Sequence, residues 1–83
     1  MSKIQDCADL IIQIMTYSSN DDTIGVESKL NSVIESMLIF LDYDDLIDIL
    51  DNHVRPNLLP TKLIIWGGYI NNKISDLKLW IRS

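Results

Sequence analysis

The residues of this chain best suited to chemistry are aspartates, and they gather in one short segment. Five of the ten residues at positions 42–51 are Asp. On a helix, Asp44, Asp48 and Asp51 stand at i, i+4 and i+7 and therefore share one face. Asp45 lies beside that face. Asp forms helices less readily than Glu, and like charges at this spacing repel. The segment is therefore either a solvated face of an acidic protein or a negative docking surface for a cationic partner.

Clustered carboxylates can also bind a metal ion, but the spacing disfavours it here. A calcium loop that began at Asp42 would need an oxygen ligand fifth, Gly sixth and Glu twelfth. The chain has apolar residues at the first two of these places and His53 at the last. Residues 44–48 do match the Asp-Asp-x-x-Asp string with which prenyl-diphosphate enzymes hold magnesium. Those enzymes enclose a large cavity between many long helices, which 83 residues cannot build. We expect no metal and no other cofactor.

Other side chains that catalyse reactions are present singly. His53 is the only histidine and Cys7 the only cysteine. A general base needs a nucleophile and an orienting group nearby, so we expect His53 to be a partly exposed helix-end residue. One thiol forms neither an internal disulfide nor a multi-cysteine zinc site, and it fits a reducing, cytoplasmic compartment. The sequence contains no nucleophile elbow and no phosphate-binding glycine loop. We therefore expect a protein that is not an enzyme.

The charge is unevenly distributed along the chain. The net charge is −5, made up of −3 over residues 1–29, −6 over residues 30–54 and +4 over residues 55–83. The middle segment contains no Lys or Arg. This balance disfavours nucleic acid as a direct ligand. The longest apolar run, residues 63–70, is too short for a membrane span, which needs about 20 residues. The expected partner is a protein that carries positive charge.

Four apolar stripes at helical spacing must position these residues. We predict helices over residues 3–17, 24–41, 43–54 and 60–82. Their start signals are Ser2 with Gln5, Asp22 or Thr23, Asp42 with Asp45, and Pro60. Short connections then give an all-α fold, a compact bundle of about four helices in a single domain over residues 1–83. The second helix could instead run straight through Asp42 into the third.

The last predicted helix holds two unusual features. Gly67 and Gly68 lie inside it, and two such glycines cost about 2 kcal/mol relative to alanines. Either they kink the helix, which we favour, or they let a neighbouring helix approach closely. Trp66 falls on the apolar stripe and is expected in the core. Aromatic and Arg side chains are good interface anchors, so Trp80 with Arg82 is a possible secondary contact, unless Trp80 packs at the edge of the core.

In size, charge, helical character and its acidic segment at 42–51, the chain resembles the small cytoplasmic immunity proteins that protect bacteria from nuclease toxins, including those of contact-dependent growth inhibition systems. The short tyrosine-rich signature of colicin DNase immunity helices is absent. The resemblance implies tight one-to-one binding to a cognate basic toxin, as an antitoxin. The residues expected to bind the partner are Asp42, Tyr43, Asp44, Asp45, Asp48 and Asp51.

Two other functions fit the same features. Phage or viral inhibitors of a host nucleic-acid-binding protein have the same small size and negative charge. A helical assembly or adaptor module would instead use its wide apolar stripes to form a homodimer or to accept a partner helix. Weakening of partner binding by salt favours inhibition through charge, and a salt-insensitive dimer favours assembly.

Overall fold

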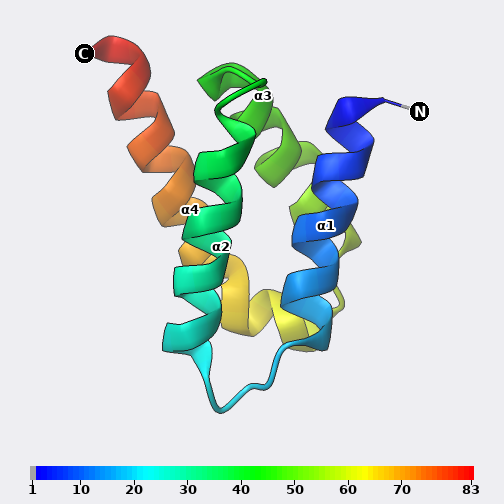
Figure 1. Cartoon of the computed structure of the whole chain (residues 1–83). Coiled ribbons are helices and arrows are strands. Elements are labelled where there is room, and N and C mark those ends of the chain that lie inside the picture. Colours follow the sequence, from blue (N-terminus) through cyan, green and yellow to red (C-terminus); the bar gives the residue numbers. More distant parts are fainter. Residues whose placement is uncertain (1) are drawn as a thin grey trace.

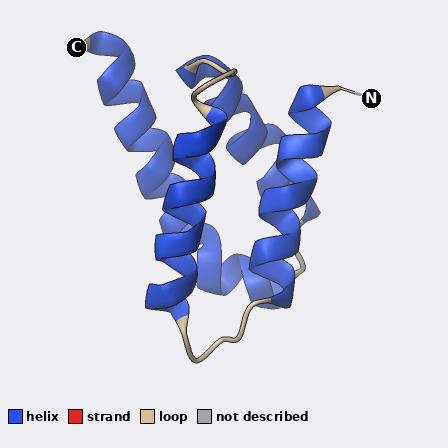
Figure 2. Ribbon diagram, in the orientation of Figure 1, coloured by secondary structure: helices blue, strands red, loops and turns tan. Residues whose placement is uncertain are grey.

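The computed structural model describes residues 2–83, and in that range the chain forms helices joined by loops, with no strand (Figures 1 and 2). The elements are α1 (Lys3–Tyr17), α2 (Thr23–Met37), α3 (Tyr43–Asp48), the π-helix η1 (Ile49–Val54), the 3₁₀-helix η2 (Arg55–Asn57) and α4 (Pro60–Arg82). The predicted all-α bundle is confirmed. The bounds of the first and last helices match the prediction, whereas the middle of the chain differs from it.

Local capping explains where the first two helices begin. The Ser2 hydroxyl accepts from the Gln5 N–H at 3.1 Å. The Gln5 side chain donates to Asp9 instead of returning to Ser2, so only half of a capping box forms there. At the start of α2, Asp22 is the cap, and its Oδ1 accepts from the Gly25 N–H at 3.1 Å. Each cap satisfies a helix N–H that has no partner within its own helix.

The second helix ends earlier than predicted. It stops at Met37, and the Met37 carbonyl then accepts from the N–H groups of both Phe40 and Leu41, at 3.1 and 2.9 Å. These bonds turn the chain, so Leu41 enters the core whereas Phe40 is 52% exposed. The expectation that residues 24–41 form one helix was wrong, because the chain turns after Met37 and the helical spacing of its apolar residues no longer applies there. The alternative of a continuous second and third helix is also wrong.

The predicted third helix, residues 43–54, is α-helical only as far as Asp48. It continues as the π-helix, in which the Arg55 N–H donates to the Leu50 carbonyl five residues back. Pro56 has no N–H to donate, and the run ends in the 3₁₀ turn that contains it. Ile49 is fully buried beside Leu50, although the predicted apolar stripe did not include it.

The buried side chains form one cluster. Its members are Cys7, Ala8, Ile11, Met15, Leu30, Ile34, Met37, Leu41, Leu46, Ile49, Leu50, Val54, Leu58, Trp66, Ile70, Ile74 and Leu77. Helix α1 packs mainly against η1 and then against α2, and α3 packs against α4. Trp66 is 1% exposed, as predicted, and its ring meets that of Tyr69 edge to face at 6.0 Å. Most of these side chains are branched or aromatic, so the cluster depends on close interlocking.

Two side chains of α4, Tyr69 and Lys62, form hydrogen bonds with segments that are far from them in the sequence. The Tyr69 hydroxyl of α4 donates to Asn31 Oδ1 of α2 at 2.6 Å. Burial, with the Glu27 carboxylate adding to it, raises the pKa of Tyr69 above its ordinary value, so the hydroxyl keeps the proton that it donates. Lys62 Nζ donates to the Ser18 carbonyl at 3.0 Å and to Asn20 Oδ1 at 2.7 Å. The loop between α1 and α2 is thereby fixed to the start of α4.

Helix α4 runs through Gly67 and Gly68 without a break. A Cβ added at Gly67 would meet only Leu63 Cδ1, at 4.0 Å, and one added at Gly68 would meet nothing within 4 Å. No neighbouring helix approaches either position, so the close-approach explanation is wrong. Neither glycine is needed for packing.

We therefore predict that Gly68→Ala raises the free energy of unfolding by about 1 kcal/mol, because alanine is the better helix former and the added methyl meets no neighbour. Urea denaturation followed by circular dichroism measures the change. Gly25→Ala is the opposite control, because its Cβ would collide with the Asp22 carboxylate that caps α2, and it should destabilise the protein. A loss of stability in Gly68→Ala would contradict the packing described for α4.

Candidate protein-binding surface

Two of the five aspartates form the start of α3. The Asp45 N–H donates to Asp42 Oδ1 at 2.9 Å, and the Asp42 N–H donates back to Asp45 Oδ2 at 3.2 Å. This is a full capping box. The sequence predicted Asp42 as the cap, but it did not predict the return bond to Asp45. Both carboxylates therefore support the helix, and each keeps lone pairs free for other contacts.

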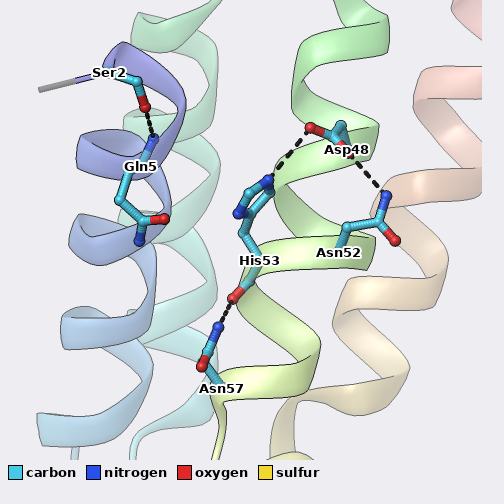
Figure 3. A network of polar contacts seen from close by, with 6 residues as sticks. All are labelled: Ser2, Gln5, Asp48, Asn52, His53 and Asn57. Carbon is cyan, nitrogen blue, oxygen red and sulfur yellow. Dashed lines mark hydrogen bonds and ion pairs between the residues drawn. The ribbon is translucent and has the colours of Figure 1, made fainter.

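Two further aspartates are paired with residues that follow the acidic segment. Asp48 Oδ2 lies 3.4 Å from His53 Nε2, and Asp48 Oδ1 accepts from Asn52 Nδ2 at 2.8 Å (Figure 3). His53 stands five residues after Asp48, the spacing that a π-helix brings into line. Asp51 Oδ1 lies 3.2 Å from Arg55 Nε. Partly exposed pairs of this kind contribute at most about 1 kcal/mol, but the Arg55 guanidinium does offset the charge of Asp51.

The expected single face of three aspartates needs a correction. Asp44 and Asp48 both lie in α3 and keep their i, i+4 relation. Asp51 lies within η1, where the α-helical spacing does not apply. It also has its own cation in Arg55. The negative face is thus shorter than predicted and lies toward the start of α3.

Asp44 differs from the other four aspartates. Its side chain is exposed and makes no hydrogen bond or ion pair with any other residue in 2–83. It follows Tyr43, a half-buried residue whose ring meets that of Trp80 at 5.8 Å and 56°. Trp80 comes from the other end of the chain and is 43% exposed. The contact joins α3 to α4, and Asp44 directly follows one of its two residues in the chain.

Two shallow hollows adjoin this aromatic pair. One, of about 250 Å³, is lined by Leu38, Leu41, Asp42 and Tyr43. The other, of about 200 Å³, is lined by Asn31, Ile34, Glu35, Leu38, Lys73 and Trp80. Leu38 lines both. Sequence reasoning missed Leu38 as a site residue, because it lies in the turn that follows the unpredicted end of α2.

We define the acidic-aromatic surface as Asp42, Tyr43, Asp44, Asp45 and Trp80. The structure thus joins four of the predicted binding residues to one of the two proposed for a secondary contact. The other, Arg82, lies exposed in the last turn of α4 and makes no hydrogen bond or ion pair with the rest of residues 2–83. Asp48 and Asp51 lie further along the segment, with the partners already described.

Signs of other chemistry are few in the described part of the chain. Residues 2–83 contain no group of three His, Cys, Asp or Glu side chains that could hold a metal ion. Burial, and then the Asp6 carboxylate, raise the pKa of Cys7, whereas a reactive thiolate needs a lowered one. Within the same residues, no helix has both the length and the apolar character needed to cross a bilayer.

Comparison of the chain with protein-family models, with curated proteins and with solved structures finds no match. The function therefore has to be inferred from the acidic-aromatic surface itself. Its distinctive features are an exposed carboxylate without a hydrogen-bond or ion-pair partner among residues 2–83, two helix-capping carboxylates near it in the chain and a partly exposed aromatic pair.

Because Asp42 caps α3 and Asp44 does not, we predict that their substitution changes the free energy of unfolding by different amounts. Asp42→Ala removes the cap of α3 and should lower the free energy of unfolding by about 1 kcal/mol. Asp44→Ala removes an exposed side chain without a partner, and the change should stay within about 0.5 kcal/mol. Urea denaturation of both variants measures the difference. Equal losses would mean that the capping box does not support α3 in the way described.

Proposed function

We propose that this chain is a protein-binding inhibitor that neutralises a basic partner, in the manner of an immunity protein, with the acidic-aromatic surface as its docking face. The observation that carries the proposal is the exposed Asp44 carboxylate, which has no hydrogen-bond or ion-pair partner among residues 2–83 and directly follows Tyr43 of the Tyr43–Trp80 pair in the chain. Asp44 lies in the first turn of α3, where its charge favours the helix, and its oxygens remain available to bind a cation on another molecule.

The charge of the segment is offset at one end only. Arg55 lies against Asp51, whereas no Lys or Arg pairs with Asp42, Asp44, Asp45 or Asp48 among residues 2–83, so the residual negative charge lies over α3 and its start. Such a local field speeds the approach of a positively charged partner and sets the orientation in which it docks. It adds less to the final affinity than to the rate and the specificity of association.

The Tyr43–Trp80 pair supplies the contact area that the carboxylates lack. Aromatic side chains dominate the energy of many interfaces, because they bury a large apolar area at a small entropic cost. The hollows on either side of Leu38 offer places for side chains of the partner. An apolar centre with charged groups around it is the usual composition of a specific interface.

The chemistry of the surface indicates the class of partner. A protein that binds nucleic acid presents Lys and Arg side chains spaced to meet phosphates. Carboxylates can take the place of those phosphates, because Arg binds both groups through paired hydrogen bonds. A nuclease toxin whose cleft is covered in this way loses access to its substrate. We therefore propose a cytoplasmic one-to-one complex in which the inhibitor blocks a basic cleft.

Affinity capture from a lysate of the source cells tests the first step. The immobilised protein should retain a basic protein in about 0.1 M salt and release it in about 1 M, where the screening length falls from about 10 Å to about 3 Å. Asp44→Lys/Trp80→Ala should not retain that protein. Asp21→Lys is the matched control, since Asp21 is exposed in the loop between α1 and α2, outside the acidic-aromatic surface, and it should behave as the wild type.

The second step is a titration of the purified partner. Its activity on nucleic acid should fall to zero at one equivalent of the wild-type chain. Asp44→Lys should weaken the binding at least tenfold, which is about 1.4 kcal/mol, with helicity unchanged by circular dichroism. If the variant inhibits as well as the wild type, the acidic-aromatic surface is not the docking face. A captured partner that is acidic would argue against the whole proposal.

A further inference from the structure

We infer that the face formed by α1 and α2 is a two-fold interface with a second copy of this chain. The two helices run antiparallel and are joined by the loop at residues 18–22 (Figure 1). A groove follows the line between them. It consists of two hollows, of about 380 and 360 Å³, and Leu10 lines both. This inference goes beyond the proposed inhibitor function and uses none of the five residues of the acidic-aromatic surface.

The groove is mostly apolar and open to solvent, with Gln13 and Ser18 in one hollow and Ser36 in the other. Leu10 is 45% exposed, Phe40 52% and Tyr17 85%. Val26 of α2 lines one hollow and Val33 lines the other, and both are half-buried. A contiguous apolar surface of this kind marks an interaction site more often than scattered single residues do.

The two ends of the groove carry opposite charges. Asp6 lines the hollow that contains Phe40, and Lys29 lines the hollow that contains Tyr17. They are the only charged residues that line the two hollows. Neither side chain makes a hydrogen bond or an ion pair with any other residue in 2–83. Lys3 lies at the Asp6 end, but its ammonium sits over the Phe40 ring at 5.8 Å and does not line the groove.

This distribution of charge makes the face complementary to itself. A two-fold axis that lies in the interface and crosses the groove at Leu10 exchanges the two hollows, so that the hollow with Asp6 in each copy lies against the hollow with Lys29 in the other. Each contact between the two copies then occurs twice, once on either side of the axis, as in other two-fold interfaces that pair the same surface of both copies. The apolar centre falls at Leu10, where the two copies would meet. Charges of one sign at both ends would have repelled a second copy. The face therefore indicates a second copy of this chain in preference to an unrelated helix.

The size of the face indicates how strong the dimer is. Two 15-residue helices side by side give a face about 22 Å long and about 20 Å wide. That footprint is smaller than the roughly 800 Å² per partner buried in a standard stable interface. We therefore expect a weak dimer whose population rises with protein concentration, built as an antiparallel assembly of four helices around Leu10.

A charge exchange between two variants tests the inference by sedimentation velocity over a range of concentrations. The wild type should dimerise. Asp6→Lys and Lys29→Asp should each raise the dimer dissociation constant at least tenfold, because each puts like charges at both contacts. An equimolar mixture of the two variants should dimerise like the wild type, since the mixed dimer has opposite charges at both ends.

Controls keep the result specific to this face. Leu10→Asp should abolish the dimer, and Asp44→Lys, which makes the same charge change outside the groove, should leave it unchanged. Circular dichroism verifies that every variant is folded. A wild type that stays monomeric up to about 1 mM would overturn the inference, and so would a mixture no better than its components. Because Asp44→Lys separates the two faces, failure here is distinguishable from failure of the proposed inhibitor function.

Discussion

The reciprocal bond between Asp42 and Asp45 fixes the middle of this structure. The chain leaves α2 through a tight turn, and without a firm start the short α3 would have little to hold it in place. The capping box satisfies two backbone N–H groups at that point. It also fixes the direction in which α3 leaves the turn, and hence the side on which Tyr43 meets Trp80 and the side on which Asp44 faces solvent.

An acidic segment is therefore not one functional unit. Two of its carboxylates build the helix start and two lie against His53 and Arg55, which follow them in the chain. The fifth, Asp44, makes no hydrogen bond or ion pair with any other residue in 2–83. Because all five residues are Asp, the sequence alone does not distinguish these roles. An inhibitor that relied on carboxylates needed for folding could not vary them to suit a new partner. A free carboxylate beside an aromatic pair can change without cost to the fold.

The sequence predicted α1 and α4 well, because their signals are local: Ser2 and Pro60 mark the starts, and uninterrupted stripes mark the lengths. It predicted the end of α2 and the course of η1 poorly. Those depend on where Leu41 and Ile49 are buried, which is decided by packing between distant segments. An α-helix bonds each N–H to the carbonyl four residues back and a π-helix to the carbonyl five residues back. The same residue types form both, so the spacing of apolar residues in a short segment does not distinguish a π-helix from an α-helix. Composition located the acidic segment, whereas the partners of each carboxylate and the Tyr43–Trp80 contact required the three-dimensional arrangement.

The two tryptophans make the molecule an optical reporter of two separate events. Trp66 is sealed in the core at 1% exposure, and Trp80 is 43% exposed on the acidic-aromatic surface. Indole emits at longer wavelength when water can reorient around it. Unfolding therefore moves the fluorescence of Trp66 toward the red. Any molecule that covers the other ring moves its fluorescence toward the blue, so denaturation and complex formation shift the spectrum in opposite directions.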